Sequence, residues 1–341
     1  MPYEPRFTIT PHLLTLVEEI AALRERINNA SVSLPWVAAL QKDTRTRNGH
    51  ASTAIEGNPL TLEQVRALEE GRELVASDKR SQREVLNYFA GLRFIEKNAK
   101  LKTIRHDHLF QLHLLLADDV MDQGHAGAYR TIAVQVGGHL PPPANDVSPL
   151  MFELLEWWNG ASNSLSPVLS SAILHYRFED IHPFADGNGR AGRALALWDL
   201  YRRGFDSHYL FSVDEYYWED RQAYYQALTQ ARKAGEDLTQ WLEYSAIGLH
   251  KTLERVWLRL NKFQYSQSAD GSNSVKINLT PRQEHLLGLL RDHGSLAPAE
   301  IWEHLKVSRQ GAMNIITPLV ESGLIEKRGT QKSGRYYLSQ P

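Results

Sequence analysis

The segment IHPFADGNGRAGR, residues 181–193, decides how the rest of this sequence is interpreted. Within thirteen residues it combines one histidine, one carboxylate, one amide, three glycines and two arginines. Apolar residues at helical spacing precede it, and Pro183 disfavours the α region for His182, which predicts that a helix ends there. Gly187 and Gly189 allow backbone amides to turn toward a ligand, close to where a second helix is predicted to begin. The segment therefore predicts a functional loop between two helices.

The polar residues of this segment have the properties of a polyphosphate site. An unperturbed histidine titrates near neutral pH, so His182 can accept a proton from a hydroxyl group. Backbone amides at the start of a helix form an anion site. Arg190 and Arg193 lie three residues apart, so both guanidinium groups can reach one anion from the same helix face. Asp186 adds an oxygen ligand suited to a Mg²⁺ ion that bridges phosphates.

Composition excludes several other classes of protein. The chain has 341 residues, no cysteine and a net charge of -2. A disulfide framework, a thiolate metal site and a cysteine nucleophile are therefore excluded, and there is no overall attraction to nucleic acid or membrane. The first residues lack a basic region followed by an apolar one, and no apolar run is long enough to span a bilayer. We expect a cytoplasmic protein without a membrane partner.

Apolar residues recur at helical spacing over most of the chain, which predicts a mainly α fold. Residues 127–143 are an exception, because apolar and other residues alternate there as in a short strand or hairpin, or in a surface excursion between helices. Three helical stretches and two short strands near the C-terminus follow the order of a winged helix-turn-helix. The predicted parts are an N-terminal helical region at 1–100, a helical core at 101–264, a linker at 265–278 and the winged helix at 279–341.

The stretch HPFADGNGRAGR matches the Fic family motif HxFx(D/E)GNGRxxR at every position that the motif defines. Similarity to the family also includes LHYRFEDI, GAYRT, RQAYYQAL and DLTQWL, so it covers residues 44–249. The resemblance implies a helical Fic-fold core with a short β-hairpin flap. It also implies AMPylation, the transfer of AMP from ATP to a hydroxyl side chain of a target protein, which includes self-modification. Members of the family often dimerise, so a homodimer is expected, although no interface is indicated.

The resemblance assigns roles to individual residues. His182 would take the proton of the attacking hydroxyl, Asp186 would hold Mg²⁺, and Tyr224 and Tyr225 would flank the adenine unless they pack in the core. The phosphates would be bound by Gly187, Asn188, Gly189, Arg190 and Arg193. The flap that aligns the target by β-augmentation would consist of Thr131, Ile132, Ala133, Val134, Gln135, Val136, Gly137 and Gly138. Doc-type members, which transfer phosphate, have a lysine in place of Gly189, so the glycine favours nucleotide transfer.

The stretch STAIEGNPL, residues 52–60, predicts a short helix that ends at Gly57, with Glu56 as a solvated carboxylate. It also resembles the inhibitory motif (S/T)xxxE(G/N) of Fic proteins, which implies an inhibitory helix near 45–57 that contains Ser52 and Glu56. Glu56 would pair with Arg193 and remove a partner of the γ-phosphate. Some relatives use this glutamate to remove AMP, so de-AMPylation remains an alternative.

The C-terminal module predicts a second binding surface. Ser308 is expected to cap a recognition helix, and Lys332 and Arg335 to lie in the wing. DNA contacts are predicted for Arg309, Gln310, Asn314, Lys327 and Arg328. The eight lysines and arginines exceed the six acidic residues of 279–341 by only two, so this electrostatic signal is weak. Docking of protein and a nucleotide-sensing, DNA-binding regulator therefore remain alternatives.

Overall fold

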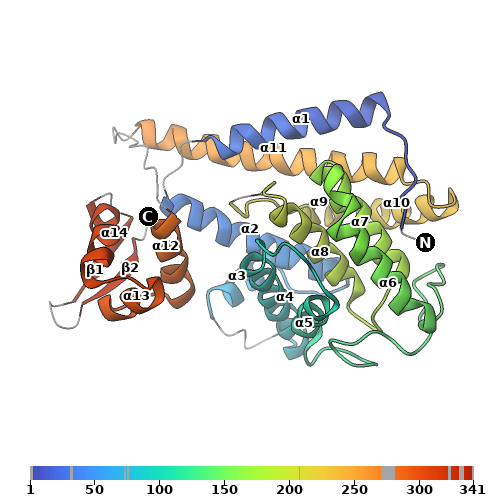
Figure 1. The fold of residues 1–341 in the computed structure, drawn as a ribbon, viewed down its shortest axis with the longest axis horizontal. Helices are drawn as coiled ribbons and strands as arrows, with labels where there is room; N and C mark the ends of the chain where they lie inside the picture. The colour runs from blue at the N-terminus through green and yellow to red at the C-terminus, as the bar shows by residue number, and fades with distance from the viewer. Residues whose placement is uncertain are drawn as a thin grey trace. The chain divides into compact units, whose positions relative to one another are not determined.

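The computed structural model describes residues 3–30, 34–72, 74, 77–206, 208–269, 281–321, 324–329 and 334–339. The chain forms two compact units, one of residues 1–29 and 42–259 and the other of residues 30–41 and 260–341. No helix in these described ranges is both long and apolar enough to cross a bilayer. The predicted mainly α fold is confirmed (Figure 1).

The first unit consists almost entirely of helices. Its elements are α1 (Pro11–Asn28), α2 (Leu34–Ile55), α3 (Leu62–Glu69), α4 (Lys79–Lys97), α5 (His106–Ala117), α6 (Ala144–Asn159), the 3-10 helix η1 (Ala161–Ser164), α7 (Pro167–Ile181), α8 (Asn188–Arg202), α9 (Asp214–Glu219), α10 (Arg221–Lys233) and α11 (Thr239–Ala269). The first residues of α2 and the last of α11 belong to the second unit. In Figure 1, α11 runs beside α1, where His250 pairs with Glu19 at 3.4 Å.

The packed pair α7 and α8 forms the centre of this unit (Figure 1). Nearly all side chains of both helices are buried, as expected for helices that are covered on every side. Trp158 of α6 donates to the buried Asp199 of α8 at 2.7 Å, which satisfies two polar groups inside the core. The loop between these two rigid helices is residues 182–187, so the core itself positions the motif predicted to be functional.

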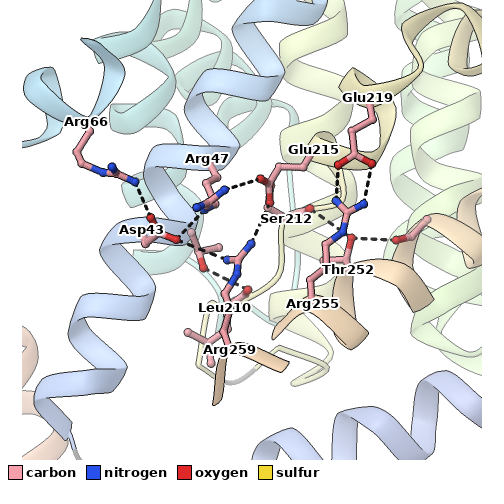
Figure 2. A network of polar contacts seen from close by, with 12 residues as sticks. Asp43, Arg47, Arg66, Leu210, Ser212, Glu215, Glu219, Thr252, Arg255 and Arg259 are labelled. Atoms are coloured by element: carbon pink, nitrogen blue, oxygen red, sulfur yellow. Dashed lines mark hydrogen bonds and ion pairs between the residues drawn. The ribbon is translucent and has the colours of Figure 1, made fainter. Parts of the chain in front are cut away.

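A network of ion pairs attaches the C-terminal half of α2 to its neighbours (Figure 2). Asp43 lies 2.7 Å from Arg47 and 3.0 Å from Arg66 of α3. Glu215 of α9 lies 3.2 Å from Arg47 and 3.7 Å from Arg259 of α11. Isolated surface pairs contribute little to stability, whereas several shared charges hold a defined geometry. The network therefore fixes the helix that leads to Ser52 and Glu56.

The second unit contains the predicted winged helix, which is confirmed. Its elements are α12 (Pro281–His293), α13 (Pro298–Leu305), α14 (Arg309–Glu321), β1 (Ile325–Arg328) and β2 (Arg335–Leu338). The strands pair antiparallel, with Ile325 opposite Leu338. Buried leucine and isoleucine side chains from all three helices form its core. Gly311 N–H donates to Ser308 Oγ at 3.2 Å, which confirms Ser308 as the cap of α14.

Two predicted segments differ from the structure. The predicted linker at 265–278 begins too early, because α11 continues through residue 269, and 270–280 lie outside the described residues. The hairpin flap is present only in its smallest form, a single antiparallel bridge between Val136 and His139 around a tight turn. Directly after the flap, the side chain of His139 contacts the core, with its ring 3.1 Å from the carbonyl of Asp180.

Candidate active site

His182 is the residue at which α7 ends, as predicted. Its backbone is left-handed, with φ 50° and ψ 62°, and its N–H still donates to the Phe178 carbonyl at 2.9 Å. A non-glycine residue adopts this conformation at an energetic cost, and such residues concentrate at functional sites. Only 15% of the His182 side chain is exposed. The local strain therefore places an almost buried imidazole at the start of the loop.

Hydrogen bonds and ring stacking hold the loop between α7 and α8 in a fixed conformation. The Asn188 side chain accepts the N–H of Phe184 and donates to its carbonyl, both at 2.8 Å. The Phe184 ring stacks on His113 with centroids 3.6 Å apart. Because Nδ1 of His113 accepts the N–H of Gly127, its Nε2 donates to the Asp186 carbonyl at 2.9 Å. The Asn188 side chain is thus used within the loop, where it closes residues 184–188.

Arg130 connects this loop to the flap, a role that the motif analysis missed. Its side chain is 4% exposed and donates to four backbone carbonyls, those of His182 (2.8 Å), Ile132 (3.0 Å), Pro142 (2.5 Å) and Ile181 (3.3 Å). One buried guanidinium group thereby holds the end of α7 and both ends of the flap together. The only signal in the sequence was an arginine directly before the alternating residues.

The start of α8 presents unpaired donors. Gly187 has a φ of 75°, which favours glycine, and the first helical bond runs from Ala191 N–H to its carbonyl at 3.0 Å. The amides of residues 188–190 therefore have no partner within the helix. Arg190 is 4% exposed, contacts the Leu116 carbonyl at 3.4 Å, and its buried Nε has no partner among the described residues. These donors are suited to an anion.

Arg193 is surrounded by the end of α2. Its Nε donates to Ser52 Oγ at 2.8 Å, and its Nη2 donates to the Ser52 carbonyl at 2.9 Å and to Glu56 Oε1 at 2.8 Å. Ser52 lies in the last turn of α2, and Glu56 follows the helix directly. The exposed fraction is 1% for the Arg193 side chain and 35% for that of Glu56. The structure therefore brings the three residues together, with the ion pair open to solvent on the side of Glu56.

Gly189 has a steric reason to be glycine in this arrangement. A Cβ atom at this position would lie 2.2 Å from Glu56 Oε1 and 3.2 Å from Arg193 Nη1. Protein atoms do not approach so closely without displacement. Any side chain at position 189 would therefore displace the Glu56 carboxylate.

The positive charges of nearby arginines stabilise the ionised form of Glu56. Partial burial acts to raise the pKa of Glu56, but Arg193, followed by Arg190 and Arg221, lowers that pKa below its usual value. Arg221 lies at the start of α10 and was not singled out in the sequence. Glu56 thus pairs with Arg193 and lies within the electrostatic influence of two further arginines, an environment that favours a negatively charged group.

His182 is neutral near physiological pH. Burial lowers the pKa of His182 to about 4, and the positive charges of Arg232 and Arg130 act in the same direction. Glu179, one turn earlier on α7, has its Oε2 3.8 Å from His182 Nδ1. Burial raises the pKa of Glu179 to about 7. A neutral imidazole beside a carboxyl group can accept a proton.

The two tyrosines predicted to flank the adenine have different environments. Tyr224 is 1% exposed, its hydroxyl lies 3.1 Å from His175 Nε2, and its ring stacks on Tyr217. The prediction for Tyr224 is therefore corrected, because core side chains cover its ring. Tyr225 is 38% exposed and lines an open groove along α10 together with Arg221, whose guanidinium carbon lies 5.4 Å from its ring centre.

The predicted surface residues are accessible. In the flap, Val134 and Val136 are half-buried and the other six predicted residues of 131–138 are exposed. In the second unit, the side chains of Arg309, Gln310, Asn314, Lys327 and Arg328 are all exposed. Lys332 lies outside the described residues.

Comparisons with known proteins agree with this geometry. Residues 103–200 match the Fic/DOC family, and residues 277–335 match the MarR family. The curated "Protein adenylyltransferase Fic" of Drosophila virilis is 30% identical over 286 residues, which are 82% of this chain and 55% of the relative. The protein of the same name from Drosophila grimshawi is 32% identical over 248 residues, 71% of this chain and 48% of the relative.

Two solved structures share the fold. A Fic family protein from Desulfovibrio desulfuricans G20 superposes with a TM-score of 0.64 at 29% identity and covers 99% of both chains. Fic-1 from C. elegans also superposes with a TM-score of 0.64, at 25% identity over 73% of each chain. The chain spans about half the length of the curated relatives it matches. It is a member of the Fic/DOC family with a C-terminal winged helix of the MarR type.

Proposed function

We propose that this chain is a protein adenylyltransferase that Glu56 holds in an inhibited state. It transfers AMP from ATP to a hydroxyl side chain of a target protein. The observation that carries the proposal is the neutral His182 beside the unpaired amides of residues 188–190 and the nearby arginines. The names of the curated relatives, which are protein adenylyltransferases, support the same reaction.

In this reaction His182 acts as the general base. It takes the proton of the target hydroxyl while the hydroxyl oxygen forms a bond to the α-phosphorus of ATP, and the bond from that phosphorus to pyrophosphate breaks. The amides of residues 188–190 and Arg190 bind the charge that develops on the phosphate oxygens. Arg193 contributes only once Glu56 releases it.

Asp186 would hold Mg²⁺. This ion is commonly bound by one or two carboxylates together with substrate phosphates and water. The Asp186 side chain is partly exposed beside the start of α8, and one of its oxygens accepts the N–H of Gly187 at 2.6 Å. The chemistry of this donor therefore fits the ion. When bound, Mg²⁺ would neutralise charge on the α- and β-phosphates.

Inhibition would follow from the Glu56–Arg193 contact. Glu56 occupies the guanidinium group that the γ-phosphate needs, at a distance of 2.8 Å. A hydrogen bond between charged groups contributes about 1.5 to 3 kcal/mol, and about 1.4 kcal/mol changes a rate tenfold. Loss of Glu56 is therefore expected to raise AMP transfer by roughly one to two orders of magnitude.

The test incubates wild type, Glu56→Gly and Glu56→Gly/His182→Ala with Mg²⁺ and α-labelled ATP, and measures labelled protein, including self-labelling. We expect weak label in wild type, strong label in Glu56→Gly and none in the double variant. If all three remain unlabelled while calorimetry shows ATP binding, transfer is contradicted. Release of AMP from an AMPylated protein would then support de-AMPylation, and its absence would leave nucleotide sensing.

The second unit supports DNA binding as a further proposed activity. It matches the MarR family, and α14 and β1 expose five polar or basic side chains that were predicted to contact DNA. Arg309→Ala and Lys327→Ala are each expected to weaken duplex binding and to reduce the slope of log K against log salt by about one. An unchanged salt slope in both variants would favour a protein partner.

A further inference from the structure

The side chains of Glu179 and His182 face each other across the last turn of α7 without a hydrogen bond between them. Glu179 Oε2 lies 3.8 Å from His182 Nδ1. The second carboxyl oxygen, Oε1, is buried and has no partner among the described residues, and the buried Nδ1 makes only a weak contact with the Glu179 backbone. A buried polar atom without a partner costs about 1 to 3 kcal/mol, and such atoms in native proteins often have a functional role.

Packing keeps Glu179 in this position. Its side chain lies against the bare backbone of α8 at Gly192, where a Cβ atom would lie 2.6 Å from Glu179 Oε1 and 3.3 Å from His175. The residue is only 6% exposed, so the carboxyl group cannot turn to solvent without repacking. A small rotation of the Glu179 carboxyl group toward the imidazole would bring it within hydrogen-bond distance of His182 Nδ1.

The surrounding charges allow Glu179 to ionise near neutral pH. Burial raises the pKa of Glu179 to about 7; Arg193 and Arg232 lower it, and Glu56 raises it. On His182, burial dominates and lowers the pKa; a hydrogen bond with the Glu179 backbone and the charge of Glu56 oppose this, and Arg232 and Arg130 act with burial. The pair therefore consists of a neutral base and an acid that gains its negative charge over the physiological range.

We propose that Glu179 is a positioning residue for AMP transfer. Its carboxylate accepts the Nδ1–H of His182 at the moment when Nε2 takes the proton of the target hydroxyl. The hydroxyl oxygen then bonds to the α-phosphorus, and pyrophosphate leaves with the electron pair of the broken bond. The imidazolium ion formed in this buried site is stabilised by the carboxylate, as in other histidine–carboxylate pairs. This inference rests on the proposed function.

The test uses the full chain in the Glu56→Gly background and measures self-labelling from α-labelled ATP between pH 5.5 and 9. Glu179→Gln is expected to lower kcat about tenfold to a hundredfold, with little change in KM for ATP. It should also remove the rise in rate that accompanies ionisation of Glu179. Because Glu56 helps to raise that pKa, the rise is expected below pH 7 in this background. Glu179→Asp should restore part of the rate.

Asp199→Asn is the matched control. Asp199 is another buried carboxyl group on this helix pair whose pKa is raised by burial, but it bonds to Trp158 and Ser170, away from His182. Its replacement should lower the melting temperature and leave the pH dependence of transfer unchanged. A Glu179→Gln variant that retains the wild-type pH dependence contradicts the proposal, whatever its rate.

Failure of the proposed function can be distinguished from failure of this inference. If Glu56→Gly itself gives no label, the transferase proposal fails, and the pair is examined by ¹⁵N NMR of the histidine rings. His182 is assigned by its loss in His182→Ala. Because Glu179 is protonated where His182 titrates, Glu179→Gln is expected to leave that titration in place and to remove a second, smaller step in the His182 signal that follows the ionisation of Glu179. A titration curve that is the same with and without Glu179 would overturn the inference. If Glu179→Gln does not fold, the His182 titration in the Glu56→Gly protein should show a second step from Glu179, and a single step contradicts the pair.

Discussion

The two ends of segment 181–193 are both largely buried, but the side chain at the first end is neutral and the side chain at the other end is charged. At the first end, burial keeps His182 neutral, and the backbone carbonyls around it are bound by Arg130. At the other end, Arg193 is only 2% exposed and remains charged, and its guanidinium group donates hydrogen bonds to Ser52 and Glu56. A neutral base is ready to act as soon as substrate arrives, whereas a paired cation must first lose its partner. In the proposed function, the proton acceptor and the residue that inhibition acts on are thus eleven positions apart in one motif.

The largest expected effect concerns the first end. In the Glu56→Gly background, His182→Ala should reduce AMP transfer by about 10²- to 10⁴-fold, because the variant lacks the proposed proton acceptor. Its stability should change little, since the side chain makes only a weak contact with the Glu179 backbone. The checks are label incorporation and urea unfolding. A variant that loses much stability but retains transfer would contradict this prediction, because His182 would then act in folding and not in transfer.

The second end should show the opposite behaviour. Arg193→Gln removes a buried cation from contact with Asp214, 3.9 Å away, as well as with Ser52 and Glu56. Breaking a buried pair commonly costs about 3 to 5 kcal/mol, so the free energy of unfolding should fall by roughly that amount. Thermal and urea unfolding measure it, and Arg72→Gln, at a largely exposed pair with Glu70 outside the network of Figure 2, is the control with little effect.

A finer change should separate the parts of the inhibitory contact. Ser52→Ala removes the 2.8 Å bond to Arg193 Nε and retains Glu56. A loss of about 1 kcal/mol corresponds to a gain in transfer of roughly fivefold, well below that of Glu56→Gly. Rates with α-labelled ATP decide the order. Equal gains in the two variants would mean that the inhibition depends on Ser52 as much as on Glu56.

The last expected effect depends on pH. The pKa of His182 is about 4 in the folded protein and about 6.5 when unfolded. The unfolded chain therefore binds the extra proton first, and stability is lost as pH falls from 6.5 toward 4. His182→Gln should remove roughly 1 to 2 kcal/mol of the decrease in unfolding free energy between pH 7 and pH 5. The same decrease in both proteins would indicate a solvated histidine.

Much of the candidate site was predictable from local rules. The stop imposed by Pro183 and the glycines at 187 and 189 predicted a loop between two helices, and the structure has α7 and α8 at these positions. The order of helices and strands near the C-terminus likewise predicted the winged helix. These predictions succeed because proline, glycine and helical periodicity act through the backbone of neighbouring residues.

Predictions that needed knowledge of neighbours were less reliable. Tyr224 and Tyr225 are adjacent in sequence, yet one is covered by the core and the other lines a groove. Asn188 was expected at the phosphates, but its side chain closes the loop onto Phe184. Residue type alone does not show which face of a helix is covered, because that depends on segments far away in the chain.

The sequence by itself determined the motif, the helical class and the pairing of a proton acceptor with an anion site, since these depend on residue types at short spacing. The expected pairing of Glu56 with Arg193 spans 137 residues and is present in the structure, and only the tertiary structure decided that Arg130 connects the flap to His182 and that Glu179 lies beside the imidazole. The physical reason is that charge state and partner choice follow from burial and distance, which long-range packing sets.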